Sequence, residues 1–242
     1  MIYKTLTRAV AQEIQALRGT FRRSPDPREQ EARIIDQFHQ LYYDGRANTQ
    51  TWRETFWMGH QVLKCPLDLW LYQELLHDLR PDLVIETGTA YGGSALFLAH
   101  ALDSLGTGRI VTVDVEARAG RPDHERITYV TGSSIDPVVI QPIVDAAAKV
   151  ETVLVVLDSD HRYDHVLAEM RALGPLVTPG SFLIVEDTNI NGHPVCPDYG
   201  PGPMEAVNAF LSERHDFQID PRWEKFILSF NPRGLLRRSG AP

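Results

Sequence analysis

Cysteine is scarce in this sequence, whose 242 residues include only Cys65 and Cys196. They lie far apart and each precedes a proline, so they form neither a zinc-ligand spacing nor a disulfide framework, and we expect a reducing compartment. Positive charge is also in short supply, since 24 lysines and arginines stand against 32 aspartates and glutamates, with a formal net charge of -8. This balance argues against binding to nucleic acid or to an anionic membrane surface, both of which need a basic face.

Long hydrophobic runs are missing as well. The beginning of the sequence lacks the continuous apolar core of a signal peptide, and no stretch reaches the roughly 20 apolar residues of a membrane-spanning helix. We therefore expect a cytoplasmic protein that does not enter a membrane. Apolar residues make up 43% and charged residues 23% of the chain, which is typical of a globular domain.

Helical patterns dominate residues 1–80. Apolar side chains are spaced as in an amphipathic helix over residues 4–18, and residues 22–28 form a linker with two prolines. Further helices are predicted over residues 29–43 and 67–79. We interpret residues 1–80 as a helical extension that serves as a lid or an oligomerisation region, and we expect a homo-oligomer.

Residues 81–242 instead alternate short apolar strands with helices. Continuous apolar strands separated by helices indicate a parallel sheet that is covered on both faces. The predicted fold is α/β, a doubly wound and mostly parallel sheet of the Rossmann type. The predicted strands are 83–86, 109–114, 127–131, 153–158, 181–187, 217–220, 226–230 and 235–237, and the predicted helices are 94–105, 137–150, 166–176 and 204–213.

A glycine-rich turn follows the first of these strands, where residues 84–94 read VIETGTAYGGS. Glycines let the backbone turn tightly and approach a ligand, and the N-terminus of the next helix offers N–H groups to an anion. The turn fits a dinucleotide or S-adenosylmethionine, but Ala90 takes the place of the middle glycine of the dinucleotide fingerprint. A purely structural glycine-rich turn is the alternative.

An acid closes the second predicted strand. Asp114 stands where a carboxylate can bind the ribose hydroxyls of either cofactor, so it does not discriminate between them. The pattern predicts S-adenosylmethionine, and Ser133 and Ser134 follow the third strand as contacts for the adenine edge. The candidate cofactor-binding residues are Glu86, Gly88, Thr89, Tyr91, Gly92, Ser94, Asp114, Ser133, Ser134 and Asp158.

Paired acids follow two later strands, in LDSDH at residues 157–161 and VEDTN at residues 185–189. If both strands are central and parallel, their carboxylates meet near the cofactor turn and repel one another unless a cation lies between them. Oxygen ligands favour a hard ion, Mg²⁺ first, with Mn²⁺ or Ca²⁺ as alternatives. The candidate ligands are Asp158, Glu186 and Asp187, with Asp160 as an alternative to Asp158. Helix capping is the competing explanation for these acids.

His161 is the candidate general base, because its unperturbed pKa suits proton removal at neutral pH and it follows Asp158 within one turn. A metal ion would stabilise the alkoxide of a hydroxyl substrate. The competing explanation makes His161 only a partner of the acids. The candidate catalytic residues are therefore His161 and Asp158, and the candidate acceptor contacts in the loop over residues 189–202 are Asn189, Asn191, His193 and Tyr199.

Five segments resemble one enzyme family. WMGHQVLKCPLDLWLYQELL, VIETGTAYGGSA, VLDSDHRYDHVLAEM, VEDTNINGHPV and GPGPMEAV are similar to segments of the bacterial rhamnosyl O-methyltransferases, which are grouped with the cephalosporin hydroxylase-like enzymes. The likeness covers roughly residues 51–213. It implies a class I methyltransferase of the Rossmann type that uses S-adenosylmethionine and Mg²⁺ on deoxysugars of glycolipids and glycosylated natural products. The family's metal-binding acids match Asp158, Glu186 and Asp187, and the base of related macrolide sugar methyltransferases matches His161.

We therefore expect an enzyme that methylates a hydroxyl of a rhamnose-like sugar in a glycoside or natural product. A methyltransferase or methoxylation component acting on a non-sugar product, such as a β-lactam nucleus, is the alternative substrate hypothesis. The alternatives of another class are a non-catalytic partner subunit and an NAD-dependent oxidoreductase. Ala90 argues against the oxidoreductase, and the clustered acids argue against a scaffold, which has no physical need for them.

Overall fold

A computed structural model describes residues 26–45 and 50–240 of the chain. The chain divides into two compact units, Met1–Gln37 and Phe38–Pro242. Helix α2 (Pro27–Asp44) confirms the helix predicted over residues 29–43. The helix predicted over residues 4–18 and most of the linker predicted over residues 22–28 lie outside the described residues.

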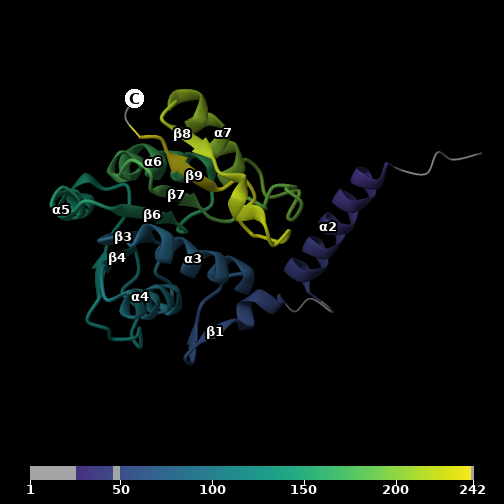
Figure 1. Cartoon of the computed structure of the whole chain (residues 1–242). Coiled ribbons are helices and arrows are strands. Elements are labelled where there is room, and N and C mark those ends of the chain that lie inside the picture. The colour runs from purple at the N-terminus through teal and green to yellow at the C-terminus, as the bar shows by residue number, and fades with distance from the viewer. Residues whose placement is uncertain (1–25, 46–49, 241–242) are drawn as a thin grey trace, which may run out of the picture. The chain divides into compact units, whose positions relative to one another are not determined.

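The second unit is built on a seven-stranded sheet with the order β5-β4-β3-β6-β7-β9-β8 (Figure 1). The strands from β5 to β7 are parallel, and β9 is antiparallel to both of its neighbours. The prediction of an α/β fold with a mostly parallel, doubly wound sheet is confirmed. The strands are β3 (Leu83–Thr87), β4 (Arg109–Asp114), β5 (Ile127–Thr131), β6 (Val153–Leu157), β7 (Phe182–Val185), β8 (Phe217–Ile219) and β9 (Leu235–Arg238).

Helices cover both faces of this sheet (Figure 1). Ile85 and Val155 point into one core with α5, α6 and α7, whereas Val84 and Leu154 point into a second core with α3 and α4. Strands that bury both faces read as continuous apolar runs, which is why the sequence pattern located them. The helices are α3 (Pro66–Leu79), α4 (Gly93–Leu105), α5 (Pro137–Ala147), α6 (Tyr163–Leu173) and α7 (Pro203–Glu213), with 3₁₀ turns η2 (Thr51–Glu54), η3 (Gly174–Leu176) and η4 (Pro221–Glu224).

The segment before the first sheet strand packs as part of the second unit. A hairpin of β1 (Phe56–Trp57) and β2 (His60–Gln61) lies against the start of α4, where a Cβ atom on Gly93 would stand 2.2 Å from the carbonyl oxygen of Gln61. Helix α3 joins the core beside α4. The compact unit that holds the sheet begins at Phe38, while a domain that starts at residue 81 stays a prediction from the sequence pattern. The lid or oligomerisation role of residues 1–80 stays a prediction.

The prediction of a strand over residues 226–230 is wrong, because these residues form a turn and a loop. Ile227 has a φ of +71° and is exposed, while Leu228 and Phe230 pack into a small core with Tyr43. The alternation of apolar residues therefore came from loop packing and not from pairing in a sheet. The backbone N–H of Phe230 donates instead to Oδ2 of Asp68, at 2.9 Å.

Asp68 belongs to a buried network that ties α3 to the end of β7. The backbone N–H of Asp187 donates to Oδ1 of Asn231 at 2.9 Å, and Nδ2 of Asn231 donates to the Tyr72 hydroxyl at 3.0 Å. Asp68 and Tyr72 lie one turn apart on α3, so this helix holds the loop that holds Asp187. Burial, opposed in part by the Phe230 N–H and the Ser229 hydroxyl, raises the pKa of Asp68 to about 7.

Among the described residues, no helix combines the length and the apolar character that a membrane span requires.

We expect the stability of the chain to depend on the ionisation of Asp68. Its folded pKa of about 7 lies above the value of about 3.9 in an unfolded chain. Between these values only the folded state keeps the proton, so the contribution of Asp68 to the free energy of unfolding falls as the pH rises from about 4 to about 7. Asp68→Asn keeps an acceptor for Phe230 and does not titrate. As the pH rises through this window, the free energy of unfolding of Asp68→Asn should increase relative to that of the parent by up to a few kcal/mol.

Urea unfolding of both proteins at about pH 5 and about pH 8 measures this change. A difference in unfolding free energy that is the same at both pH values would show that folded Asp68 does not take up a proton in this range.

Candidate functional site

The carboxyl ends of the parallel strands open into a cavity of about 600 Å³. This is where ligands bind in open α/β sheets. The turn after β3, the end of β4 and the segments after β5, β6 and β7 all contribute to its wall, as does the segment between β2 and α3. Its lining residues include Val62, Leu63, Gly88, Thr89, Ser94, Asp114, Ser134, Asp158, Asp160, His161 and Asp187.

Gly88 lets the turn after β3 approach the end of β6. Its φ is +84°, and a Cβ atom at this position would lie 1.7 Å from the carbonyl oxygen of Asp158. Any side chain here would therefore push the two strand ends apart. Gly88 thereby brings the predicted cofactor turn and Asp158, a predicted metal-binding residue, to the wall of one cavity.

Asp114 both stabilises this turn through a hydrogen bond and lines the cavity. Its Oδ2 accepts the backbone N–H of Ala90 at 2.7 Å and lies 3.2 Å from Nη2 of Arg121, while its Oδ1 accepts the N–H of Glu116 at 2.9 Å. The carboxylate closes β4 as the sequence predicted. Its contact with a ribose stays a prediction.

The predicted cofactor-binding residues fall into two groups. Gly88, Thr89, Ser94, Asp114, Ser134 and Asp158 line the cavity. In the described part of the chain, Glu86, Tyr91, Gly92 and Ser133 are not among its lining residues, so for these four the cofactor contact stays a prediction without support from the cavity.

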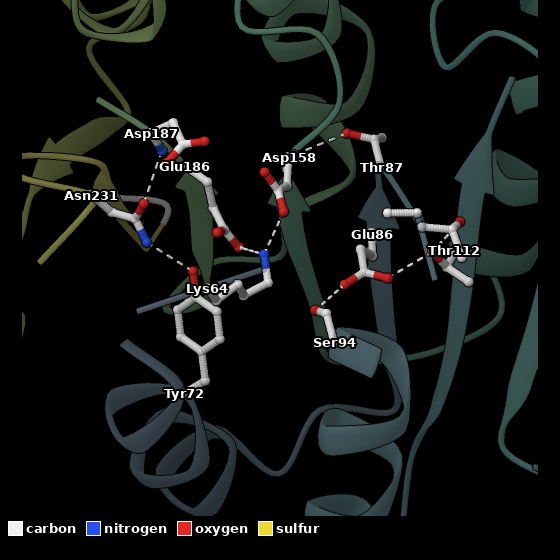
Figure 2. A network of polar contacts seen from close by, with 12 residues as sticks. Lys64, Tyr72, Glu86, Thr87, Ser94, Thr112, Asp158, Glu186, Asp187 and Asn231 are labelled. Carbon is white, nitrogen blue, oxygen red and sulfur yellow. Dashed lines mark hydrogen bonds and ion pairs between the residues drawn. The ribbon is translucent and has the colours of Figure 1, made fainter. Parts of the chain in front are cut away.

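Glu86 lies beneath the cavity wall in a polar network of its own (Figure 2). It is fully buried and accepts hydrogen bonds from the hydroxyls of Ser94 and Thr112, the latter at 2.7 Å. Burial raises the pKa of Glu86, and the nearby Lys64 ammonium opposes this shift. Tyr91 instead lies on the surface, 44% exposed, with the Arg118 guanidinium 5.0 Å from the centre of its ring.

The acids after β6 and β7 surround a lysine that the sequence analysis missed (Figure 2). Nζ of Lys64 lies 2.5 Å from Oδ2 of Asp158 and 2.5 Å from Oε1 of Glu186. Its side chain is only 2% exposed. Burial alone would lower the pKa of Lys64, but the carboxylates outweigh burial and raise this pKa, so the group is an ammonium ion. The available signal was one charged residue inside the apolar stretch VLKCPL just before a helix.

Asp158, His161 and Asp187 form a second part of the acid cluster, on the cavity side. Their ligand atoms all lie within 4.8 Å of one another, and Nε2 of His161 is 3.0 Å from Oδ2 of Asp187. Burial would lower the pKa of His161, but Asp187, Asp158 and Glu186 together outweigh it and raise the pKa. Asp187 has a φ of +54°, a conformation that its N–H bond to Asn231 helps to hold.

The four predicted metal ligands are thus held differently. Asp158 and Asp187 face the cavity beside His161, whereas the carboxylate of Glu186 is bound by the Lys64 ammonium. Asp160 lines the cavity, but both of its oxygens accept from Nε of Arg162, at 3.0 and 2.9 Å, and this bond lowers its pKa to about 2. The geometry therefore favours Asp158 over Asp160.

The predicted acceptor contacts hold the loop over residues 189–202 together. Asn189 is buried with its Nδ2 3.0 Å from Nε2 of His39, and Oδ1 of Asn191 accepts the N–H of Gly200 at 3.1 Å. Nε2 of His193 lies 2.7 Å from Oε1 of Glu205. Within the described residues, these side chains and the 45% exposed Tyr199 do not line the cavity, so their contact with an acceptor stays a prediction.

A second group of potential metal ligands, His100, Asp103 and His124, lies away from this cavity. Nδ1 of His100 accepts the indole N–H of Trp57 at 2.9 Å, and Nδ1 of His124 accepts the backbone N–H of Arg126 at 3.2 Å. Each ring therefore carries its proton on Nε2, the nitrogen that a metal would need unprotonated. The hydrogen bonds favour a surface polar cluster over a metal centre.

Comparisons with known proteins identify the family and the fold of the chain. The family model for rhamnosyl O-methyltransferase/CmcI matches residues 49–239. The rhamnosyl O-methyltransferase of Mycobacterium tuberculosis (strain ATCC 25618 / H37Rv) is 40% identical over 213 residues, which is 85% of each chain. The apo structure of CmcI-N160 has a TM-score of 0.63 and 22% identity, covering 91% of this chain and 88% of that one. The structure of cmcI-D160 with Mg and SAM has a TM-score of 0.58 and 21% identity, covering 81% of each.

Asp114→Ala should weaken the binding of S-adenosylhomocysteine, the demethylated form of the predicted cofactor. Loss of charge-assisted hydrogen bonds to a ribose costs about 1–3 kcal/mol. Asp114→Asn is the matched control, because it keeps an acceptor for the Ala90 N–H and loses only the charge, so its affinity should fall between those of the parent and Asp114→Ala. Calorimetric titration measures all three, and parental affinity in a folded Asp114→Ala protein would remove Asp114 from the site.

Proposed function

This chain belongs to the rhamnosyl O-methyltransferase/CmcI family, and from that membership we propose that it methylates a hydroxyl of a deoxysugar with the assistance of Mg²⁺. It is an S-adenosylmethionine-dependent O-methyltransferase. The proposed acceptor is a rhamnose-like sugar of a glycoside or glycosylated natural product. The 40% identity to a curated relative named rhamnosyl O-methyltransferase supports a sugar as the acceptor.

One observation supports the proposal most strongly. A single cavity of about 600 Å³ is lined by the glycine turn and Asp114 on one side and by Asp158, His161 and Asp187 on another. The first set suits the cofactor, and the second set suits a cation and a proton acceptor. Methyl transfer needs these two sets within reach of the same hydroxyl, because the reacting atoms must lie close together and in line.

The residues of the cavity fit a magnesium ion. Asp158 and Asp187 offer hard carboxylate oxygens that point to one place, and Mg²⁺ is usually bound by one or two carboxylates with water or substrate oxygens completing its shell. When bound, Mg²⁺ would supply Lewis-acid stabilisation of negative charge on the acceptor oxygen. Asp158 and Asp187 would hold the ion, and Glu186 lies in the same cluster but is bound to Lys64.

His161 is the proposed general base. Its Nε2 is 3.0 Å from Oδ2 of Asp187, which places the ring proton on Nε2 and leaves Nδ1 with the lone pair that takes the proton of the acceptor hydroxyl. Asp187 thereby orients the ring and stabilises the imidazolium that forms. Because its surroundings raise the pKa of His161, the ring accepts the proton readily but is active only where it is neutral, on the less acidic side of its pKa.

A homo-oligomer is also proposed. Ile34, Phe38 and Leu41 of α2 follow one another at helical spacing and are 58%, 52% and 50% exposed. Large apolar side chains exposed along one helix are a feature of subunit interfaces. The cytoplasmic location expected from the sequence stays a prediction.

Turnover should require a divalent cation. The parental chain, given labelled S-adenosylmethionine and a rhamnosyl glycoside, should transfer the label to the sugar, lose this activity in excess EDTA and regain it with Mg²⁺ or Mn²⁺. Asp187→Asn should need far more Mg²⁺, because it removes a ligand charge. Asp103→Asn is the matched control in the surface cluster and should keep the parental requirement. Full turnover by protein shown to be free of metal would contradict the proposed metal site.

His161→Ala should lower turnover by about 10²–10⁴-fold, the usual contribution of a general base. Binding of S-adenosylhomocysteine and of Mn²⁺ should persist, since Gly88, Asp114 and the two metal-binding acids remain. The pH–rate profile of the variant should lose the acidic limb of the parent. If the variant keeps near-parental turnover and the same acidic limb, His161 is not the base.

A further inference from the structure

The geometry points to Lys64 as a positioning residue that sets the metal affinity of the cavity, by holding Asp158 and Glu186 with an internal positive charge. The inference rests on the proposed Mg²⁺ site. It assigns Lys64 two effects. The acid cluster folds without a metal ion, and the site on the cavity side binds a metal ion more weakly than Asp158, Glu186 and Asp187 would bind it without the lysine.

The position of the ammonium group supports this role. Figure 2 shows Lys64 between the carboxylates of Asp158 and Glu186, and its Nζ lies 2.5 Å from an oxygen of each. These acids follow β6 and β7, the neighbouring strands that carry the proposed metal ligands. Asp158 is shared, because it contacts Lys64 through Oδ2 and also belongs to the group with His161 and Asp187.

The charges of the cluster explain the effect on the metal. Glu86, Asp158 and Glu186 act on Lys64 and keep it charged despite its complete burial. A dication that shares Asp158 with Lys64 lies close to this ammonium and is repelled by it. Coulomb repulsion at such a separation weakens binding by at least about tenfold, even at an effective dielectric constant of about 20. Glu186, which could otherwise bind the dication, is held by Lys64.

The backbone next to Lys64 shows that the ion pairs also position the cavity wall. Leu63 has a φ of +61°, an uncommon conformation for a leucine that the surrounding structure must hold in place. Val62 and Leu63 both line the cavity. The Lys64 ion pairs fasten this segment to the ends of β6 and β7, so one side chain orders both the acids and the apolar wall beside them.

The test compares Mn²⁺ binding by the parental chain, Lys64→Met and the double variant Lys64→Met/Glu186→Gln, each freed of metal with EDTA. Lys225→Met is the matched control, because Lys225 pairs with Glu74 on the surface. Electron paramagnetic resonance gives the Kd for Mn²⁺, and thermal unfolding with and without Mn²⁺ gives the stabilisation by the ion.

Lys64→Met should lower the Tm of the metal-free chain, because it leaves buried acids without a counter-charge. It should bind Mn²⁺ about tenfold or more tightly than the parent. A tenfold change adds about 1.4 kcal/mol of stabilisation by the ion at saturation, or roughly 3–6 °C in Tm for a chain of this size. The double variant removes one charge of each sign and should return toward the parental Kd, while Lys225→Met should match the parent.

The outcomes separate this inference from the proposed function. If the parent itself does not bind Mn²⁺, the proposed metal site fails, and the inference fails with it. If the parent binds Mn²⁺ but Lys64→Met binds it equally or more weakly, only the role of Lys64 is overturned. Should Lys64→Met be unfolded without metal, folding on addition of Mn²⁺ supports the inference, and failure to fold in saturating Mn²⁺ overturns it.

Discussion

The ion pairs of Lys64 with Asp158 and Glu186 are the interaction on which the site depends. Parallel strands end at one edge of a sheet, so acids that follow β6 and β7 are brought together whether or not this is favourable. Buried carboxylates without a counter-charge cost several kcal/mol each. The ammonium of Lys64 offsets part of this cost, and its 2.5 Å contacts fix both strand ends relative to the segment before α3.

Helix α3 acts as the scaffold for the same edge of the sheet. It follows directly after Lys64, and its Asp68 and Tyr72 hold the loop that contains Phe230 and Asn231. Asn231 in turn accepts the backbone N–H of Asp187. A site held in this way from a packed helix keeps its acids in position before any ligand arrives, which is the requirement for preorganised catalysis.

The two halves of the cavity are joined by a close backbone approach. Gly88 allows the turn after β3 to touch the carbonyl of Asp158, so the proposed cofactor turn and the proposed cation site share a wall. Asp114 braces the turn from the other side through Ala90. Methyl transfer between two bound groups requires this short separation, and the fold provides it through backbone contacts that tolerate no side chain at Gly88.

The sequence by itself determined the sheet, the glycine turn and the positions of the acids. Strands buried on both faces must be apolar, and the residues after them must lie at the carboxyl edge, so Asp114, Asp158 and Asp187 could be placed without a structure.

Only the tertiary structure decided which side chains meet there. Lys64 lies 94 residues from Asp158 and 122 from Glu186 along the chain, and no local pattern records a pairing over such distances. The same holds for Glu86, which lies in β3 as predicted but accepts hydrogen bonds from Ser94 and Thr112 and is not among the lining residues of the cavity. It holds as well for residues 226–230. Their apolar alternation resembles that of a strand, but the backbone N–H of Phe230 donates to the side chain of Asp68 and not to a neighbouring strand. Local periodicity encodes which residues are buried, whereas the partner of a buried charge depends on which distant segments the fold brings beside it.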